Sequence, residues 1–179
     1  MLTITFARHG QYTAQTLTED GVNQARMLGN MLSTQNLAVF TIISSPSQRA
    51  LQTSRIIGAE LGGIAVAAVS TLAADSSHDL NYHADNISAI TARYLETFEA
   101  IPKESDNILV VTHEPNVIGF TLAFAKAAGK SYFDPMTCGA VSYQIEAETW
   151  EDVVELMKSD AEDIAEISLV YRVETLQLG

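Results

Sequence analysis

The chain has 179 residues, of which 47% are hydrophobic, and its ten basic and 22 acidic residues give a formal net charge of −12 at pH 7. This length is typical of one domain, and a chain of this composition buries enough apolar surface to exclude disorder as its main state. The negative charge argues against nucleic acid or an anionic membrane surface as a partner. We therefore predict a single domain over residues 1–179.

The charge is unevenly distributed along the chain. Residues 1–61 contain four arginines against three acids, a net charge of +1. Residues 146–166 contain nine acids against Lys158, a net charge of −8. A local basic pocket in the first segment can therefore hold an anion, while the acidic segment favours a basic protein surface as a partner.

The sequence carries no sign of export or of a membrane span. Cys138 is the sole cysteine, so no disulfide can form within the chain. The first residues reach Arg8 and His9 before an apolar signal core could be built, and no run approaches the roughly 18 apolar residues of a membrane helix. We expect a cytoplasmic protein that does not associate with membranes.

Short β-branched apolar runs alternate with stretches of helical period, which predicts an α/β fold of three layers, α/β/α, around a mostly parallel sheet. The first helix begins after Thr18, an N-cap residue, and the second begins at Ser45-Pro46, where proline suits the first helical position. Strands are predicted at 2–7, 39–44, 64–69, 107–112, 140–146 and 167–173, and further helices at 86–101, 115–128 and 150–158.

Three polar clusters directly follow predicted strands. They are Arg8-His9-Gly10, Ser44-Ser45-Pro46 with Arg49, and Thr112-His113-Glu114-Pro115. Because ligands of open parallel sheets bind outside the carboxyl ends of the strands, we expect these clusters to meet. Two guanidinium groups and two imidazoles suit a phosphoryl group, with Arg49 in the first turn of its helix adding the positive end of the helix dipole.

Metal and cofactor sites fit the sequence less well. Val117 stands where a helical zinc motif would need a second histidine after His113, and no glycine-rich dinucleotide loop follows the first strand. His78, His83, Asp79 and Asp85 are more simply read as a solvated loop than as a metal site. We predict no metal and no cofactor.

These segments resemble the histidine phosphatase superfamily, the phosphoglycerate mutase-like proteins, and most closely its short bacterial phosphohistidine phosphatases. The resemblance covers residues 2 to about 128 and extends to the tail, 139–175, around Trp150. It is carried by Arg8-His9-Gly10, Leu17-Thr18-Glu19-Asp20-Gly21 with Gln24-Ala25, Ser44-Ser45-Pro46 with Arg49-Ala50 and Gln52-Thr53, and Val110-Val111-Thr112-His113.

The resemblance implies a phosphatase that works through a covalent phosphohistidine on His9 and acts on phosphohistidine or a phosphomonoester. Arg8, Arg49 and His113 would hold the phosphoryl oxygens. Gln15 falls where mutase relatives carry an asparagine that touches phosphate, and is a further candidate contact.

The general acid and the substrate remain open. Many relatives have a glutamate in the loop after the third strand, where this chain has none, so Asp75 is the best substitute, with Asp79, His78 and Glu114 as alternatives. A weak or displaced general acid favours a substrate with a nitrogen leaving group, as in phosphohistidine, over one with a sugar alcohol as leaving group. Other functions to weigh are a sugar or glycerate phosphate phosphatase or mutase, a non-catalytic phosphate-binding module, and an acidic adaptor.

Overall fold

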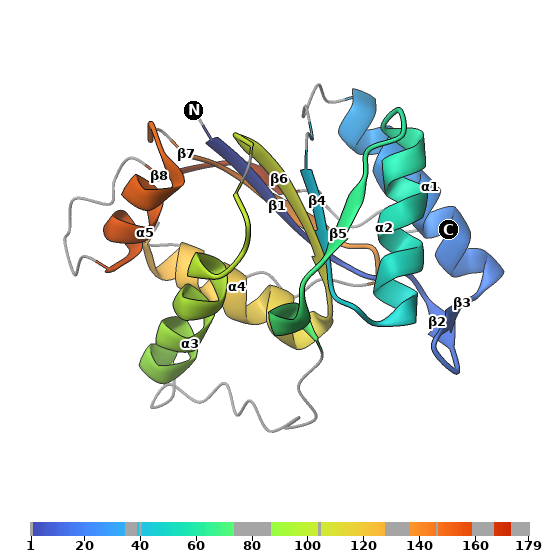
Figure 1. The fold of residues 1–179 in the computed structure, drawn as a ribbon, viewed down its shortest axis with the longest axis horizontal. Helices are drawn as coiled ribbons and strands as arrows, with labels where there is room; N and C mark the ends of the chain where they lie inside the picture. The colour runs from blue at the N-terminus through green and yellow to red at the C-terminus, as the bar shows by residue number, and fades with distance from the viewer. Residues whose placement is uncertain are drawn as a thin grey trace.

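The computed structural model describes residues 2–34, 39, 41–73, 87–103, 105–127, 137–145, 147–158 and 167–172. Within these residues a six-stranded sheet lies between two layers of helices (Figure 1). In chain order the elements are β1 (Leu2–Arg8), β2 (Tyr12–Thr13), β3 (Thr16–Leu17), α1 (Glu19–Thr34), β4 (Thr41–Ser44), α2 (Gln48–Glu60), β5 (Val66–Ala68), the 3₁₀ helix η1 (Ser70–Leu72), α3 (Ile87–Glu99), β6 (Asn107–Thr112), α4 (Glu114–Ala127), β7 (Ala140–Ile145), α5 (Trp150–Lys158) and β8 (Ile167–Arg172).

The sheet is mostly parallel, as the sequence predicted. Its strand order is β5-β4-β6-β1-β7-β8, and β5, β4, β6 and β1 run parallel while β7 and β8 each pair antiparallel to their neighbour. Arg8 pairs with Thr112, and Ser44 pairs with Val111. The carboxyl ends of β1, β4 and β6 therefore lie at one edge, and the three polar clusters follow from that edge.

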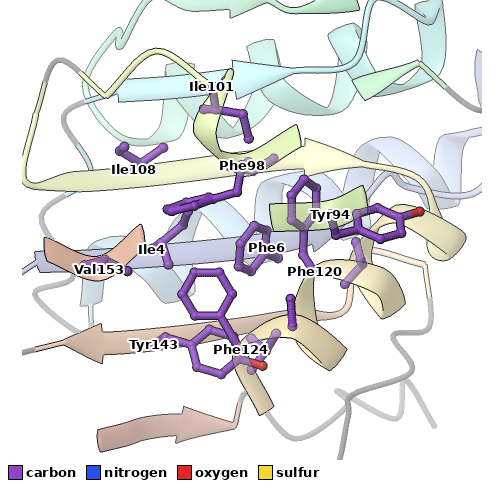
Figure 2. Close-up of a cluster of buried hydrophobic side chains, with 14 of the residues drawn as sticks. Ile4, Phe6, Tyr94, Phe98, Ile101, Ile108, Phe120, Phe124, Tyr143 and Val153 are labelled. Atoms are coloured by element: carbon purple, nitrogen blue, oxygen red, sulfur yellow. The ribbon is translucent and has the colours of Figure 1, made fainter. Parts of the chain in front are cut away.

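Helices cover both faces of the sheet, α1 and α2 on one side and α3, α4 and α5 on the other (Figure 1). Successive residues of β1 face opposite sides of the sheet. Phe6 packs toward α4, and Ala7 belongs to the core beneath α1 and α2. The ring of Phe6 stacks on Phe120 with centroids 4.8 Å apart and meets the edge of Phe124 at 5.3 Å (Figure 2). Because both faces are buried, the strands read as apolar runs rather than alternating ones.

Helix starts agree with the sequence at α1 and differ slightly elsewhere. The Thr18 hydroxyl accepts a hydrogen bond from the Gly21 N–H at 3.1 Å, which confirms the predicted N-cap. Helix α2 begins at Gln48 with Ser47 as its N-cap, so the predicted start at Ser45-Pro46 was too early. Ser45 lies outside the helix because its N–H still donates to the Val111 carbonyl of β6.

The loop after β1 packs unusually close to α1 because two glycines face each other. A Cβ atom on Gly21 would lie 2.0 Å from the carbonyl oxygen of Gln11, and one on Gly10 would lie 2.6 Å from the carbonyl oxygen of Gly21. The Gln24 side chain accepts a hydrogen bond from the Gln11 N–H at 2.9 Å. The backbone beside His9 is thus held against α1 without intervening side chains. Among the described residues, no helix is both long and apolar enough to cross a membrane.

Candidate active site

The residues that the sequence singled out at the strand ends come together. His9 follows β1, Arg49 lies in the first turn of α2, and His113 lies between β6 and α4. The two histidines are 3% and 2% exposed, and their ring centroids are 5.1 Å apart. Backbone hydrogen bonds continue past the strands, from the His9 N–H to the Thr112 carbonyl at 3.0 Å. The imidazoles are therefore placed by the sheet itself.

Arg49 links three of the predicted site residues through one guanidinium group. Its Nε donates to Nε2 of His9 at 3.0 Å, and its Nη2 donates to Nδ1 of His113 at 3.1 Å. Its Nη1 donates to the side-chain oxygen of Gln15. Five fixed donors on one planar group make this multiple contact possible, and lysine could not reproduce it.

The hydrogen bonds of His9 define its tautomer. Nδ1 is the donor to the carbonyl of Gly10 at 2.9 Å, because Nε2 accepts from Arg49 and so carries the lone pair. The Thr53 hydroxyl connects the backbone next to His9 with the backbone of Arg49. It accepts from the Gly10 N–H at 3.0 Å and donates to the Arg49 carbonyl at 2.8 Å. Thr53 thus ties the His9 loop to α2. Nε2 carries the lone pair and is therefore the nucleophilic nitrogen of this tautomer.

His113 has the opposite tautomer. Its Nδ1 accepts from Arg49, so its Nε2 is the donor to the hydroxyl of Ser45 at 2.8 Å. Ser45 in turn accepts from the Ser47 N–H at 3.3 Å, just before α2 begins. The Ser45 backbone continues the sheet pairing, since its N–H donates to the Val111 carbonyl at 2.9 Å.

Both imidazoles are neutral over most of the pH range. Burial lowers the pKa of His9 to about 4, helped by the charges of Arg49 and Arg8 and opposed by the hydrogen bond to Gly10. Burial also lowers the pKa of His113 to about 3, together with the neighbouring His9 and the same two arginines. Neutral rings are what the two acceptor nitrogens require, since both accept from Arg49.

We expect His9 and His113 to stay neutral in the folded protein at pH 6, a pH at which a solvent-exposed histidine is largely protonated. Their pKa values lie below that of the unfolded chain, so the unfolded state binds more protons between pH 6.5 and 4, and stability falls as the pH is lowered through that window. NMR titration of the ring protons checks the first statement, and urea unfolding at several pH values checks the second. A ring midpoint near 6.5 for His9 would contradict both.

Arg8 and Glu114 form an ion pair at the same edge of the sheet. Nη1 of Arg8 lies 2.5 Å from Oε2 of Glu114, and the two side chains are 24% and 42% exposed. The positive charge of Arg8 also lowers the pKa of both imidazoles, so it acts on the same pocket. Glu114 is therefore directed at Arg8 rather than away from the site.

A short hairpin, β2 and β3, brings two more side chains to the site. Ala14 and Gln15 at its turn have φ of 50° and 87°, a left-handed conformation that favours glycine or asparagine. The hairpin places Gln15 on Arg49 and also sets the ring of Tyr12 4.5 Å from the Arg49 guanidinium carbon and 5.0 Å from the His9 ring centroid. Sequence analysis missed Tyr12, because nothing in the pattern distinguishes it from any exposed hairpin aromatic.

The remaining candidates come from the loop after the third predicted strand. Asp75, His78 and Asp79, like His83 and Asp85, lie outside the described residues.

Cys138 lies beside the site. Its N–H donates to the His9 carbonyl at 3.2 Å, but burial raises the pKa of its thiol to about 12, so it is no nucleophile. In the part of the chain that the structure describes, no three histidine, cysteine or carboxylate side chains gather as metal ligands.

Comparison with known proteins agrees with the resemblance seen in the sequence. The family model described as histidine phosphatase superfamily (branch 1) matches residues 4–74. No curated protein sequence matches the chain significantly.

Solved structures with the same fold include several phosphatases. The protein histidine phosphatase SixA complexed with tungstate is 20% identical with a TM-score of 0.56, covering 80% of this chain and 88% of its own. A phosphoserine phosphatase from Entamoeba histolytica with 3-phosphoglyceric acid is 17% identical with a TM-score of 0.58, covering 81% and 91%. A mycobacterial glucosyl-3-phosphoglycerate phosphatase with VO3 is 15% identical with a TM-score of 0.56, covering 80% and 93%.

These matches confirm the resemblance predicted from the sequence. Residues 4–74 carry the pattern of the histidine phosphatase superfamily, and the chain has the α/β fold of its phosphoglycerate mutase-like members. The match of residues 4–74 to this family model agrees with the enzyme class predicted from the sequence, a phosphatase.

Proposed function

We propose that the protein is a phosphatase that takes a phosphoryl group from phosphohistidine or a phosphomonoester onto Nε2 of His9 and then passes it to water. One observation carries the proposal: His9 is buried, neutral and held with its Nε2 lone pair against Arg49. A neutral imidazole with a fixed tautomer is a nucleophile, whereas an imidazolium is not. Gly10 fixes the tautomer by accepting the Nδ1 proton.

The reaction divides into two displacements. In the first, the Nε2–P bond forms as the bond from phosphorus to the leaving group breaks, and that group keeps the bonding electrons. In the second, water attacks phosphorus, the Nε2–P bond breaks, and His9 recovers its lone pair while phosphate leaves with the two protons of water. Two easier steps replace one difficult displacement.

Arg8 and Arg49 are the proposed ligands of the phosphoryl oxygens, with Gln15 beside them, and His113 would join them by turning its Nε2–H from Ser45 to an oxygen. Two guanidinium groups supply the positive charge that phosphoryl transfer needs, and positioning with electrostatic stabilisation supplies most of the rate. Arg49 already touches His9, His113 and Gln15, so a phosphoryl group arriving at Nε2 would meet its donors directly. We propose that no metal is needed.

Esters and phosphoramidates differ in their need for an acid. An alkoxide leaving group must be protonated in the transition state, for which Asp75, Asp79, His78 and Glu114 are the candidates. A sugar or glycerate phosphatase or mutase is the second candidate function, because solved structures with this fold include a glucosyl-3-phosphoglycerate phosphatase as well as a protein histidine phosphatase. A non-catalytic phosphate-binding module would need only the arginines, not a neutral His9 held in one tautomer.

A substrate panel in the presence of a chelator tests the proposal. We expect turnover of a phosphohistidine peptide or of phosphate esters, and, after rapid quenching in alkali, one phosphoryl group per chain on His9, where phosphoramidates survive. Comparison of the phosphohistidine peptide with phosphosugars and phosphoglycerates separates the two candidate functions. Turnover without any phosphoryl group on His9 would contradict the covalent step, and loss of turnover in the chelator would contradict metal independence.

A further inference from the structure

We infer that Glu114 makes the site select phosphoryl donors whose leaving group carries a positive charge, such as a protonated phosphoimidazole. The inference rests on the proposed function and names the substrate class within it. It begins from the ion pair between Glu114 and Arg8. A carboxylate on a phosphate-binding arginine offsets part of the positive charge that an anionic substrate would meet.

Glu114 is a partly exposed carboxylate held on Arg8. Its Oε2 lies 2.5 Å from Nη1 of Arg8. The Glu114 side chain is 42% exposed, while the neighbouring His113 is 2% exposed. The carboxylate is therefore more exposed than the imidazole next to it in the chain, and a leaving group on that exposed side would meet it.

The formal charge of the site agrees with such a substrate. Arg8 and Arg49 contribute two positive charges, Glu114 contributes one negative charge, and both imidazoles are neutral because burial and the arginines lower their pKa. The described site thus carries a net charge of +1. A phosphate ester dianion carries two negative charges, whereas a phosphoimidazole protonated at its second nitrogen carries one, with its positive end on the leaving group.

The chemistry of that leaving group removes the need for a proton donor. As Nε2 of His9 bonds to phosphorus, the P–N bond of the protonated phosphoimidazole breaks and its electrons return to the departing nitrogen. The ring leaves as neutral imidazole, keeping its N–H proton, and His9 takes over the positive charge as a phosphoimidazolium. Atoms and charge balance without any acid. Glu114 would favour this path by accepting the N–H of the charged ring.

Replacing Glu114 with glutamine tests the inference, because glutamine keeps the length of the side chain and an oxygen for Arg8 but removes the charge. Three substrates are compared: a phosphohistidine peptide, the same peptide with phosphoserine, and p-nitrophenyl phosphate, whose leaving group needs no proton. We expect kcat/KM to fall about tenfold for phosphohistidine alone, and inorganic phosphate to inhibit at a several-fold lower concentration.

Other patterns would overturn the inference. An equal loss on all three substrates would mean that Glu114 only positions Arg8. A loss on phosphoserine with phosphohistidine spared would make Glu114 the general acid. Glu151→Gln is the matched control, an exposed acid in the first turn of another helix, α5, and it should change none of the rates. If the wild-type protein turns over none of the substrates and His9 takes no label, the proposed function itself fails.

Discussion

Replacing His9 with alanine is expected to lower kcat/KM by about 10⁴-fold or more on every substrate, because the covalent path is lost with the nucleophile. The ring is 3% exposed and donates to Gly10 while it accepts from Arg49. The Cys138 thiol beside the site offers no substitute nucleophile, because burial raises its pKa to about 12. Steady-state kinetics with the best substrate of the panel measure the loss.

Binding of inorganic phosphate provides the control for the His9→Ala variant. Arg8 and Arg49 remain in it, so it should still bind phosphate or vanadate and unfold cooperatively. Loss of turnover with binding intact would locate the defect in the chemical step. Turnover within tenfold of wild type would show that His9 is not the nucleophile, and equal binding without turnover in the wild type would favour a phosphate-binding module.

Replacing Arg49 with lysine is expected to lower kcat/KM by about 10³-fold, in the range seen when an arginine that stabilises a phosphoryl transition state is lost. The lysine ammonium keeps the charge but cannot donate to His9, Gln15 and His113 at once from one plane. His9 then loses the donor that orients its ring. We expect a lower kcat as well as a higher KM, since both positioning and binding depend on this group.

Arg55→Lys is the matched control for this substitution. Arg55 lies on the same helix, α2, six residues further on, and is exposed. It should leave both kinetic constants unchanged, and both variants should unfold at the same urea concentration as the wild type. Activity of Arg49→Lys within tenfold of wild type would mean that a point charge suffices at this position.

Much of the fold followed from local patterns. The capping of α1 by Thr18 and the strand ends at Ser44 and Thr112 were readable because propensity, caps and apolar runs act over short distances, whereas β1 extends to Arg8, beyond its predicted end at residue 7. The convergence of the polar clusters followed from one general rule about parallel sheets. The start of α2 was misplaced, because the Ser45 N–H still pairs with the carbonyl of Val111 in β6, a contact between distant parts of the chain.

The sequence by itself determined which groups gather at the sheet edge: two histidines, two arginines and an adjacent glutamate. Only the tertiary structure decided what state those groups are in. Burial and the two arginine charges make the imidazoles neutral, Gly10 and Ser45 set opposite tautomers, and Arg8 takes Glu114 as its partner. Solvation and hydrogen-bond partners depend on residues far apart in the chain, and so a list of residue types could not contain them.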